Sequence, residues 1–192
     1  MEKTDIKSMN MEELTEYIIS LGEKKFRAKQ IYGWIHVKHV ESFEEMTNIS
    51  KKFIENLSAE AKIVCVKKEE VQISKIDGTR KYLFSLDDGN VIESVLMKYK
   101  HGNSVCISSQ VGCRMGCRFC ASTQAGRVRN LEAGEICSEI YTAQKDIGER
   151  ISHIVLMGIG EPLDNFDEVM RFLENITSPE GVNIGMRNIS LS

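Results

Sequence analysis

No apolar run in this chain approaches the length of a membrane span, and the N-terminus lacks the basic and then apolar pattern of a secretory signal. We therefore expect neither a membrane anchor nor a secreted protein. Internal repeats and low-complexity tracts are also missing, and the only prolines are Pro162 and Pro179. The 192 residues, 42% of them hydrophobic with a mean hydropathy of -0.24, suffice for one medium domain or two small ones with a real core.

A disulfide framework is disfavoured as well. The chain has six cysteines, and three of them fall within one short stretch. Clustered cysteines fit a metal in a reducing compartment better than a set of disulfides. The sequence therefore predicts a cytoplasmic protein.

Negative charge is missing from two stretches of an otherwise acidic chain. The net charge is -3, which taken alone argues mildly against nucleic-acid binding. Residues 24–40 and 94–131, however, contain no Asp or Glu and carry several Lys and Arg. Such local basic stretches predict an RNA-binding surface. A solvated face, or charge that balances a metal cluster, would give the same pattern.

The first 62 residues carry the signals of a small helical domain. Asn10 and Glu13 form a capping-box pattern, apolar residues follow at helical spacing, and Gly22 stands where a helix would end. Three further helices are predicted: over 26–36, after a capping box of Ser42 and Glu45, and from Ser50 onward.

Residues 63–100 are predicted to form a β-hairpin that links two domains, with strands at 81–86 and 91–97 around an Asp-Asp-Gly-Asn turn. From 101 onward, strands alternate with helices. The strands are expected at 104–109, 154–157 and 188–192, and the helices from Asn130 and from Asp164 or Asn165. This alternation predicts an α/β fold with a parallel sheet. Because the sequence stops inside the third strand, we expect a fragment of a longer protein.

Cys113, Cys117 and Cys120 are spaced as C-x3-C-x2-C. Three thiolates this close can hold one iron–sulfur cluster and leave it one protein ligand short, so that one iron is open to another molecule. A structural zinc site usually closes with four protein ligands. A zinc site completed by Cys106, or three reduced buried cysteines, are the alternatives.

Two more motifs flank this triplet. Cys106-Ile-Ser-Ser-Gln-Val-Gly leads into it, and Met157-Gly-Ile-Gly-Glu-Pro-Leu163 follows it. Together with C-x3-C-x-aromatic-C, these motifs resemble radical S-adenosylmethionine (SAM) enzymes. Among them, the chain looks like the RNA adenine-C2 methyltransferases of large-subunit ribosomal RNA and, in many members, transfer RNA. The resemblance covers most of the chain.

The resemblance implies a fold and a domain order. Residues 101–192 would be the N-terminal part of a (βα)6 radical SAM barrel, truncated after the third strand. A helical RNA-binding domain over 1–62 and the hairpin linker over 63–100 would precede it.

The same resemblance implies the residues of a cofactor site. Cys113, Cys117 and Cys120 would hold a [4Fe–4S] cluster, whose open iron would bind SAM. Four further residues match positions that contact SAM: Phe119, Gly160, Glu161 and Ser192. For Ser192, the last residue of the sequence, a simple strand hydroxyl is the alternative.

Two residues match catalytic positions of the family. Glu93 falls where the family has its proposed proton acceptor, although an exposed strand glutamate would look the same. Cys106 matches the cysteine that resolves a protein–RNA crosslink by forming a disulfide. Its partner would be the methyl-carrying cysteine, which is expected beyond Ser192. A buried structural cysteine is the alternative for Cys106.

The implied partners are ribosomal and transfer RNA and an electron donor such as flavodoxin or ferredoxin, with the protein acting as a monomer. Three other functions remain open. They are C8 methylation of adenine, as in the antibiotic-resistance relatives, a non-enzymatic metal-stabilised RNA-binding module, and a truncation product inactive on its own.

Overall fold

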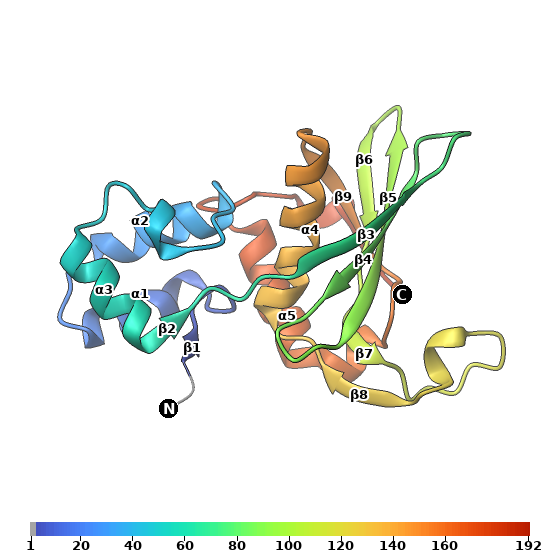
Figure 1. The fold of residues 1–192 in the computed structure, drawn as a ribbon, viewed down its shortest axis with the longest axis horizontal. Helices are drawn as coiled ribbons and strands as arrows, with labels where there is room; N and C mark the ends of the chain where they lie inside the picture. Colours follow the sequence, from blue (N-terminus) through green and yellow to red (C-terminus); the bar gives the residue numbers. More distant parts are fainter. Residues whose placement is uncertain (1–2) are drawn as a thin grey trace.

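The computed structural model describes residues 3–192, which form a helical region and a sheet region (Figure 1). The helical region holds three α-helices and one short 3-10 helix: α1 (Met11–Ser20), α2 (Phe26–His36), η1 (Phe43–Glu45) and α3 (Lys51–Glu60). Their inner faces pack into one apolar core, which includes Leu14, Ile18, Ile31, Ile35, Phe53 and Leu57. A parallel pair of two-residue strands, β1 (Thr4–Asp5) and β2 (Ala61–Lys62), joins the two ends of this region.

The capping signals place these helices as predicted. The Asn10 side chain accepts a hydrogen bond from the Glu13 backbone N–H, and the Glu13 carboxylate accepts one from the Asn10 backbone N–H, both at 2.9 Å. At the start of η1, the Glu45 carboxylate likewise accepts a hydrogen bond from the Ser42 backbone N–H, at 3.0 Å. Gly22 follows α1 with φ +80°, a conformation that glycine adopts at little cost. The predicted start and end signals of the helical region are therefore confirmed.

The sheet region is built on six strands in the spatial order β10-β9-β6-β5-β4-β3. Their bounds are β3 (Lys67–Ile73), β4 (Arg80–Ser85), β5 (Val91–Tyr99), β6 (Gly102–Cys106), β9 (Ile151–Leu156) and β10 (Ile189–Leu191). Strands β6, β9 and β10 are mutually parallel, and β3 to β6 are antiparallel neighbours. The predicted parallel sheet is thus confirmed for one half, and the other half is antiparallel.

The predicted hairpin is confirmed as β4 and β5, with Gly89 of its turn at φ +82°. Its strands do not stand apart from the following sheet, because β5 is hydrogen-bonded to β6. Strand β3 is not predicted by the sequence. Its residues, Lys-Lys-Glu-Glu-Val-Gln-Ile, are mostly charged and exposed, so no apolar alternation marks them as a strand.

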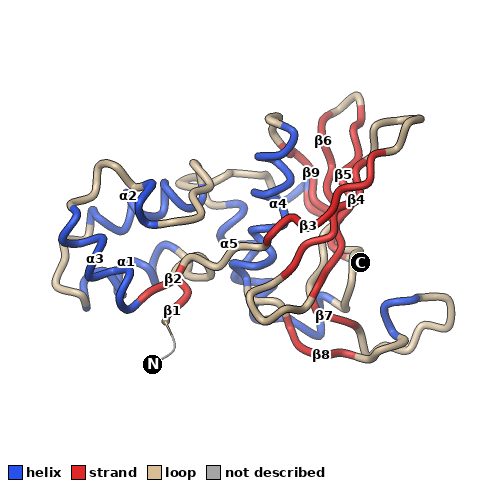
Figure 2. Tube along the Cα trace, in the orientation of Figure 1, coloured by secondary structure: helices blue, strands red, loops and turns tan. Residues whose placement is uncertain are grey.

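Helices α4 (Ala133–Ile147) and α5 (Phe166–Thr177) cover one face of the sheet and lie between it and the helical region (Figure 2). The prediction that Asn130 caps the first of these helices is wrong. Asn130 ends β8 (Arg127–Asn130), which pairs with β7 (Gln110–Gly112), and Glu132 is the N-cap of α4. The 3-10 helix η3 (Pro162–Asn165) precedes α5, whose N-cap is Asn165, as predicted.

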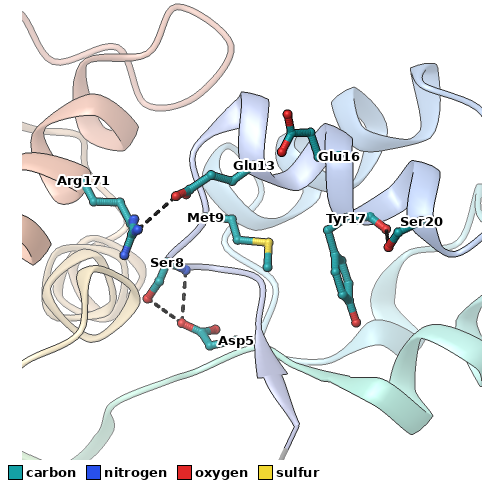
Figure 3. Close-up of a pocket in the computed structure, with 8 residues that line it drawn as sticks. All are labelled: Asp5, Ser8, Met9, Glu13, Glu16, Tyr17, Ser20 and Arg171. Carbon is teal, nitrogen blue, oxygen red and sulfur yellow. Dashed lines mark hydrogen bonds and ion pairs between the residues drawn. The ribbon is translucent and has the colours of Figure 1, made fainter.

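Polar contacts join the helical region to α4 and α5. The Tyr32 hydroxyl lies 3.0 Å from Asn175 Oδ1, and His36 Nδ1 lies 2.7 Å from the Tyr141 hydroxyl. Between α1 and α5, Arg171 Nη2 lies 2.9 Å from Glu13 Oε1, beside a cavity of about 510 Å³ (Figure 3). Within residues 3–192, no helix is both long enough and apolar enough to cross a membrane.

Candidate cofactor-binding site

The three-cysteine loop connects β7 to β8 and projects from the lower edge of the sheet region in Figure 1. Its backbone is held by short-range bonds: Cys113 N–H donates to Ser122 O and Cys120 N–H to Cys117 O, both at 3.0 Å. The Thr123 hydroxyl donates to Cys120 O at 2.9 Å. Apart from the short 3-10 helix η2 (Ala121–Thr123), the loop contains no regular structure.

The thiols of this loop differ in exposure. Cys113 is buried, Cys117 is exposed and Cys120 is intermediate, and all six cysteines of the chain are free. In the part of the chain that the structure describes, no three His, Cys, Asp or Glu side chains are arranged to hold a metal ion. The donor set nevertheless fits an iron–sulfur cluster, because three cysteine sulfurs lie on one partly exposed loop. The loop therefore contains the three cysteine ligands, but their side chains are not arranged around a common point.

The Gly158-Ile-Gly-Glu161 segment follows β9 and lies against residues 107–110, which follow β6. Ser109 N–H and Gln110 N–H both donate to Ile159 O, at 2.9 and 3.1 Å. A Cβ on Gly160, where φ is +113°, would lie 2.7 Å from Ser109 Oγ and from Gln110 Cβ. The two segments therefore approach so closely that only glycine fits at this position.

Glu161 is the N-cap of η3, and its carboxylate accepts a hydrogen bond from Leu163 N–H at 3.1 Å. Its own backbone N–H donates to Gln110 Oε1 at 3.0 Å. Ser192 is exposed and follows β10. Because β6, β9 and β10 are parallel, Cys106, Glu161 and Ser192 all come after or at the carboxyl ends of neighbouring strands. That edge is where barrel enzymes bind their ligands.

Glu93 and Cys106 share one face of the sheet. Cys106 pairs with Val95 across β5 and β6, and Glu93 is two residues from Val95, so alternation places all three on one side. The buried neighbours Ile92 and Ser94 point to the other side, toward the helices. The structure thus brings both predicted catalytic residues to the side that α4 and α5 leave uncovered.

The two groups have different electrostatic surroundings. Glu93 Oε1 lies 2.7 Å from Lys81 Nζ, and its side chain is 45% exposed. Burial raises the pKa of the Cys106 thiol, with a smaller opposing effect from the backbone of Met157. Phe119, in contrast, is 95% exposed on the cysteine loop and is not gathered with the other predicted SAM contacts.

Comparison with known proteins shows which family this chain is similar to. A model described as "Ribosomal RNA large subunit methyltransferase N-terminal domain" matches residues 4–63. A protein named probable dual-specificity RNA methyltransferase RlmN, from Lachnoclostridium phytofermentans, is 58% identical over 191 residues, which cover 100% of this chain and 54% of that protein. A protein of the same name from Alkaliphilus metalliredigens is also 58% identical, with the same coverage. The chain matches the N-terminal portion of the RlmN family.

The fold agrees with this similarity. The crystal structure of a radical SAM methyltransferase from Sphaerobacter thermophilus matches with a TM-score of 0.91 and 33% identity, over 98% of this chain and 56% of that one. The predicted α/β fold of the radical SAM type is therefore confirmed. The chain spans about half the length of the RlmN relatives it matches.

Two residues that support the candidate site are not identified by the sequence. Asp164 binds side chains from both ends of the cysteine loop, and Glu139 is a buried carboxyl beneath residues 106–108. The sequence marks Asp164 only as a possible helix cap, and Glu139 is one charged residue in an amphipathic helix. The Glu139 side chain points from that helix toward the sheet. A charged residue on the apolar face of the helix is the one sequence signal that could have identified it.

Proposed function

We propose that this chain is the cofactor-binding part of an enzyme that methylates C2 of an adenine in large-subunit ribosomal RNA and in transfer RNA. The observation that carries the proposal is the common location of its motifs. Cys106 ends β6, Gly158 to Glu161 follow β9, and the two segments after β6 and β9 are hydrogen-bonded to each other. The cysteine loop begins directly after this junction, so its donors start beside the predicted SAM-binding segment.

Cys113, Cys117 and Cys120 would hold the [4Fe–4S] cluster, and SAM would complete the open site. When bound, the two cofactors supply the radical chemistry and the methyl group. The chain supplies position: the Glu161 carboxylate can accept a charge-assisted hydrogen bond from the SAM ammonium. Three more residues are proposed to contact SAM: Phe119, Gly160 and Ser192.

Glu93 and Cys106 would act on the substrate from the open face of the sheet. The Glu93 carboxylate would take the proton that leaves adenine C2, and Lys81 places a positive charge beside it. The Cys106 thiol, whose pKa burial raises, would be held protonated until its sulfur is needed to release the product. Its disulfide partner is predicted beyond Ser192.

The RNA would be recognised first through the helical region. Among residues 3–192, three of the five cations of the first basic stretch form no ion pair (Lys24, Lys25 and Lys38), whereas Arg27 and Lys29 do. In the second stretch only two of six form none (Lys100 and Arg118), and Lys98, Arg114, Arg127 and Arg129 are bound to carboxylates. Unpaired cations contribute more to phosphate binding, so we place the RNA contact mainly around α2. A flavodoxin or ferredoxin as reductant, a monomeric state and a cytoplasmic location remain predictions.

The test uses the full-length protein on ribosomal and transfer RNA, with methylated nucleotides identified by mass spectrometry. We expect 2-methyladenosine from the wild type, and none above background from E93Q or C106A. C65A, which changes a cysteine outside the site, is the control and should retain activity. Product at C8, or no product with fully loaded wild-type protein, would overturn the proposal.

A further inference from the structure

One carboxylate holds both ends of the three-cysteine loop. Asp164 lies in η3, three residues after Glu161, and its side chain is only 9% exposed. It forms an ion pair with the Arg114 guanidinium, and its Oδ2 lies 3.1 Å from Arg127 Nη1. Arg114 directly follows the first cysteine of the loop, and Arg127 begins β8, where the loop ends. Two cations at the two ends of one loop thus share a single acid.

An amide network extends this contact toward the glutamate segment. Gln110 Nε2 donates to Asp164 Oδ2 at 3.0 Å and to Asn130 Oδ1 at 2.8 Å. The same Gln110 side chain accepts a hydrogen bond from Glu161 N–H at 3.0 Å. Arg127 Nη1 also lies 3.3 Å from Asn130 Oδ1. Asp164 is therefore connected to the segment before the loop, the strand after it, and the Gly158–Glu161 segment.

The loop needs such an attachment because little else orders it. Only short-range hydrogen bonds and one short 3-10 helix occur within it, and Met115 and Phe119 are exposed. An isolated surface ion pair contributes little, but a poorly exposed carboxylate that binds two guanidinium groups and an amide is a network. Fixing both ends also lowers the conformational entropy that the loop must lose when it binds a cluster.

We propose that Asp164 is a positioning residue that fastens both ends of the three-cysteine loop to the Gly158–Glu161 segment. In this role it sets the cluster ligands in a fixed relation to the SAM-binding residues. The second part rests on the proposed function, whereas the fastening itself concerns the chain without cofactor.

The first experiment measures hydrogen–deuterium exchange of residues 113–126 in the cofactor-free 192-residue chain. D164A and D164N are expected to raise exchange there several-fold and to leave β3 to β6 unchanged. D167N is the control: Asp167 is exposed, and its side chain forms none of the side-chain hydrogen bonds or ion pairs found among residues 3–192. If D164A does not fold, R114A and R127A each release one end and should raise exchange at that end. Wild-type exchange in all of these variants would overturn the fastening.

The second experiment reconstitutes the same variants with iron and sulfide and titrates SAM, followed by electron paramagnetic resonance. D164A should bind as much iron as the wild type, because its cysteines are intact, but the SAM-dependent change should need roughly tenfold more SAM or more. A mobile loop with unchanged SAM binding would overturn the positioning role. If the wild type itself binds no iron, the proposed function fails, while the exchange experiment still decides the fastening.

Discussion

Glu139 is a fully buried carboxyl group on α4, and no cation among residues 3–192 lies within ion-pair distance of it. It accepts hydrogen bonds from Ser108 N–H at 3.1 and 3.2 Å and is hydrogen-bonded to the Ser94 hydroxyl. The Ser108 hydroxyl in turn donates to Glu93 O at 2.8 Å and accepts from Ile159 N–H at 3.1 Å. Glu139 therefore supports the backbone around both predicted catalytic residues and the glycine segment.

Burial raises the pKa of Glu139 well above its ordinary value of 4.5, more than its two hydrogen-bond donors lower it. The native state then holds the proton more tightly than the unfolded state, so this group destabilises the fold as pH rises above about 4.5. We expect E139Q to remove that pH dependence while keeping the hydrogen bonds. E139L should destabilise the fold by roughly 1–3 kcal/mol for each buried group left without a partner.

Urea unfolding at pH 6 and pH 8 measures both effects. This account of Glu139 would be contradicted if E139Q lost as much unfolding free energy as E139L. It would also be contradicted if the unfolding free energy of E139Q changed with pH as much as that of the wild type.

His36 has the opposite effect on acid stability. Burial lowers its pKa to about 3 from 6.5, so the native state binds fewer protons than the unfolded state at acidic pH. Stability should therefore fall as pH drops below 6.5 and continue to fall toward about 3. H36Q is expected to flatten this decline in urea midpoints between pH 7 and pH 4. The exposed His101 provides the control, and the urea midpoints of H101Q should change with pH as those of the wild type do. If the midpoints of H36Q also follow the wild type, His36 is not the cause of the decline.

At the level of elements, the close approach of the segments after β6 and β9 depends on Gly160. G160A should cost about 1–3 kcal/mol from backbone strain alone, because φ is +113°. The added methyl also meets Ser109 and Gln110. Gly185 is the matched control, because its φ is -64° and a Cβ added there would meet nothing within 4 Å.

Thermal or urea unfolding decides this comparison. G160A should be clearly less stable than G185A, and equal stabilities would show that the two segments can separate without cost.

Elements with local chemical signals are predictable from the sequence. The capping boxes at Asn10 and Ser42 place helices because the cap itself satisfies free N–H groups. Strands β3 and β8 escape prediction because they are exposed and charged, and only pairing with a distant segment makes them strands. The wrong prediction for Asn130 has the same cause: its partner, Gln110, lies 20 residues earlier.

For the whole molecule, the spacing of Cys113, Cys117 and Cys120 points to the family, because cofactor ligands must be specific residues at specific distances. The spatial arrangement of the candidate site is harder to predict from the sequence. That Glu93 and Cys106 lie on one face follows from the pairing of β5 with β6, which the sequence does not state. The contacts of Asp164 join residues up to 54 positions apart, and no local pattern indicates them.

The measurement that tests the central claim most directly is electron paramagnetic resonance of the reduced chain after anaerobic iron–sulfide reconstitution, with and without SAM. The account predicts a [4Fe–4S] signal that changes when SAM is added, is lost in C117A and is retained in C65A. Zinc in place of iron, or a cluster signal indifferent to SAM, would contradict it.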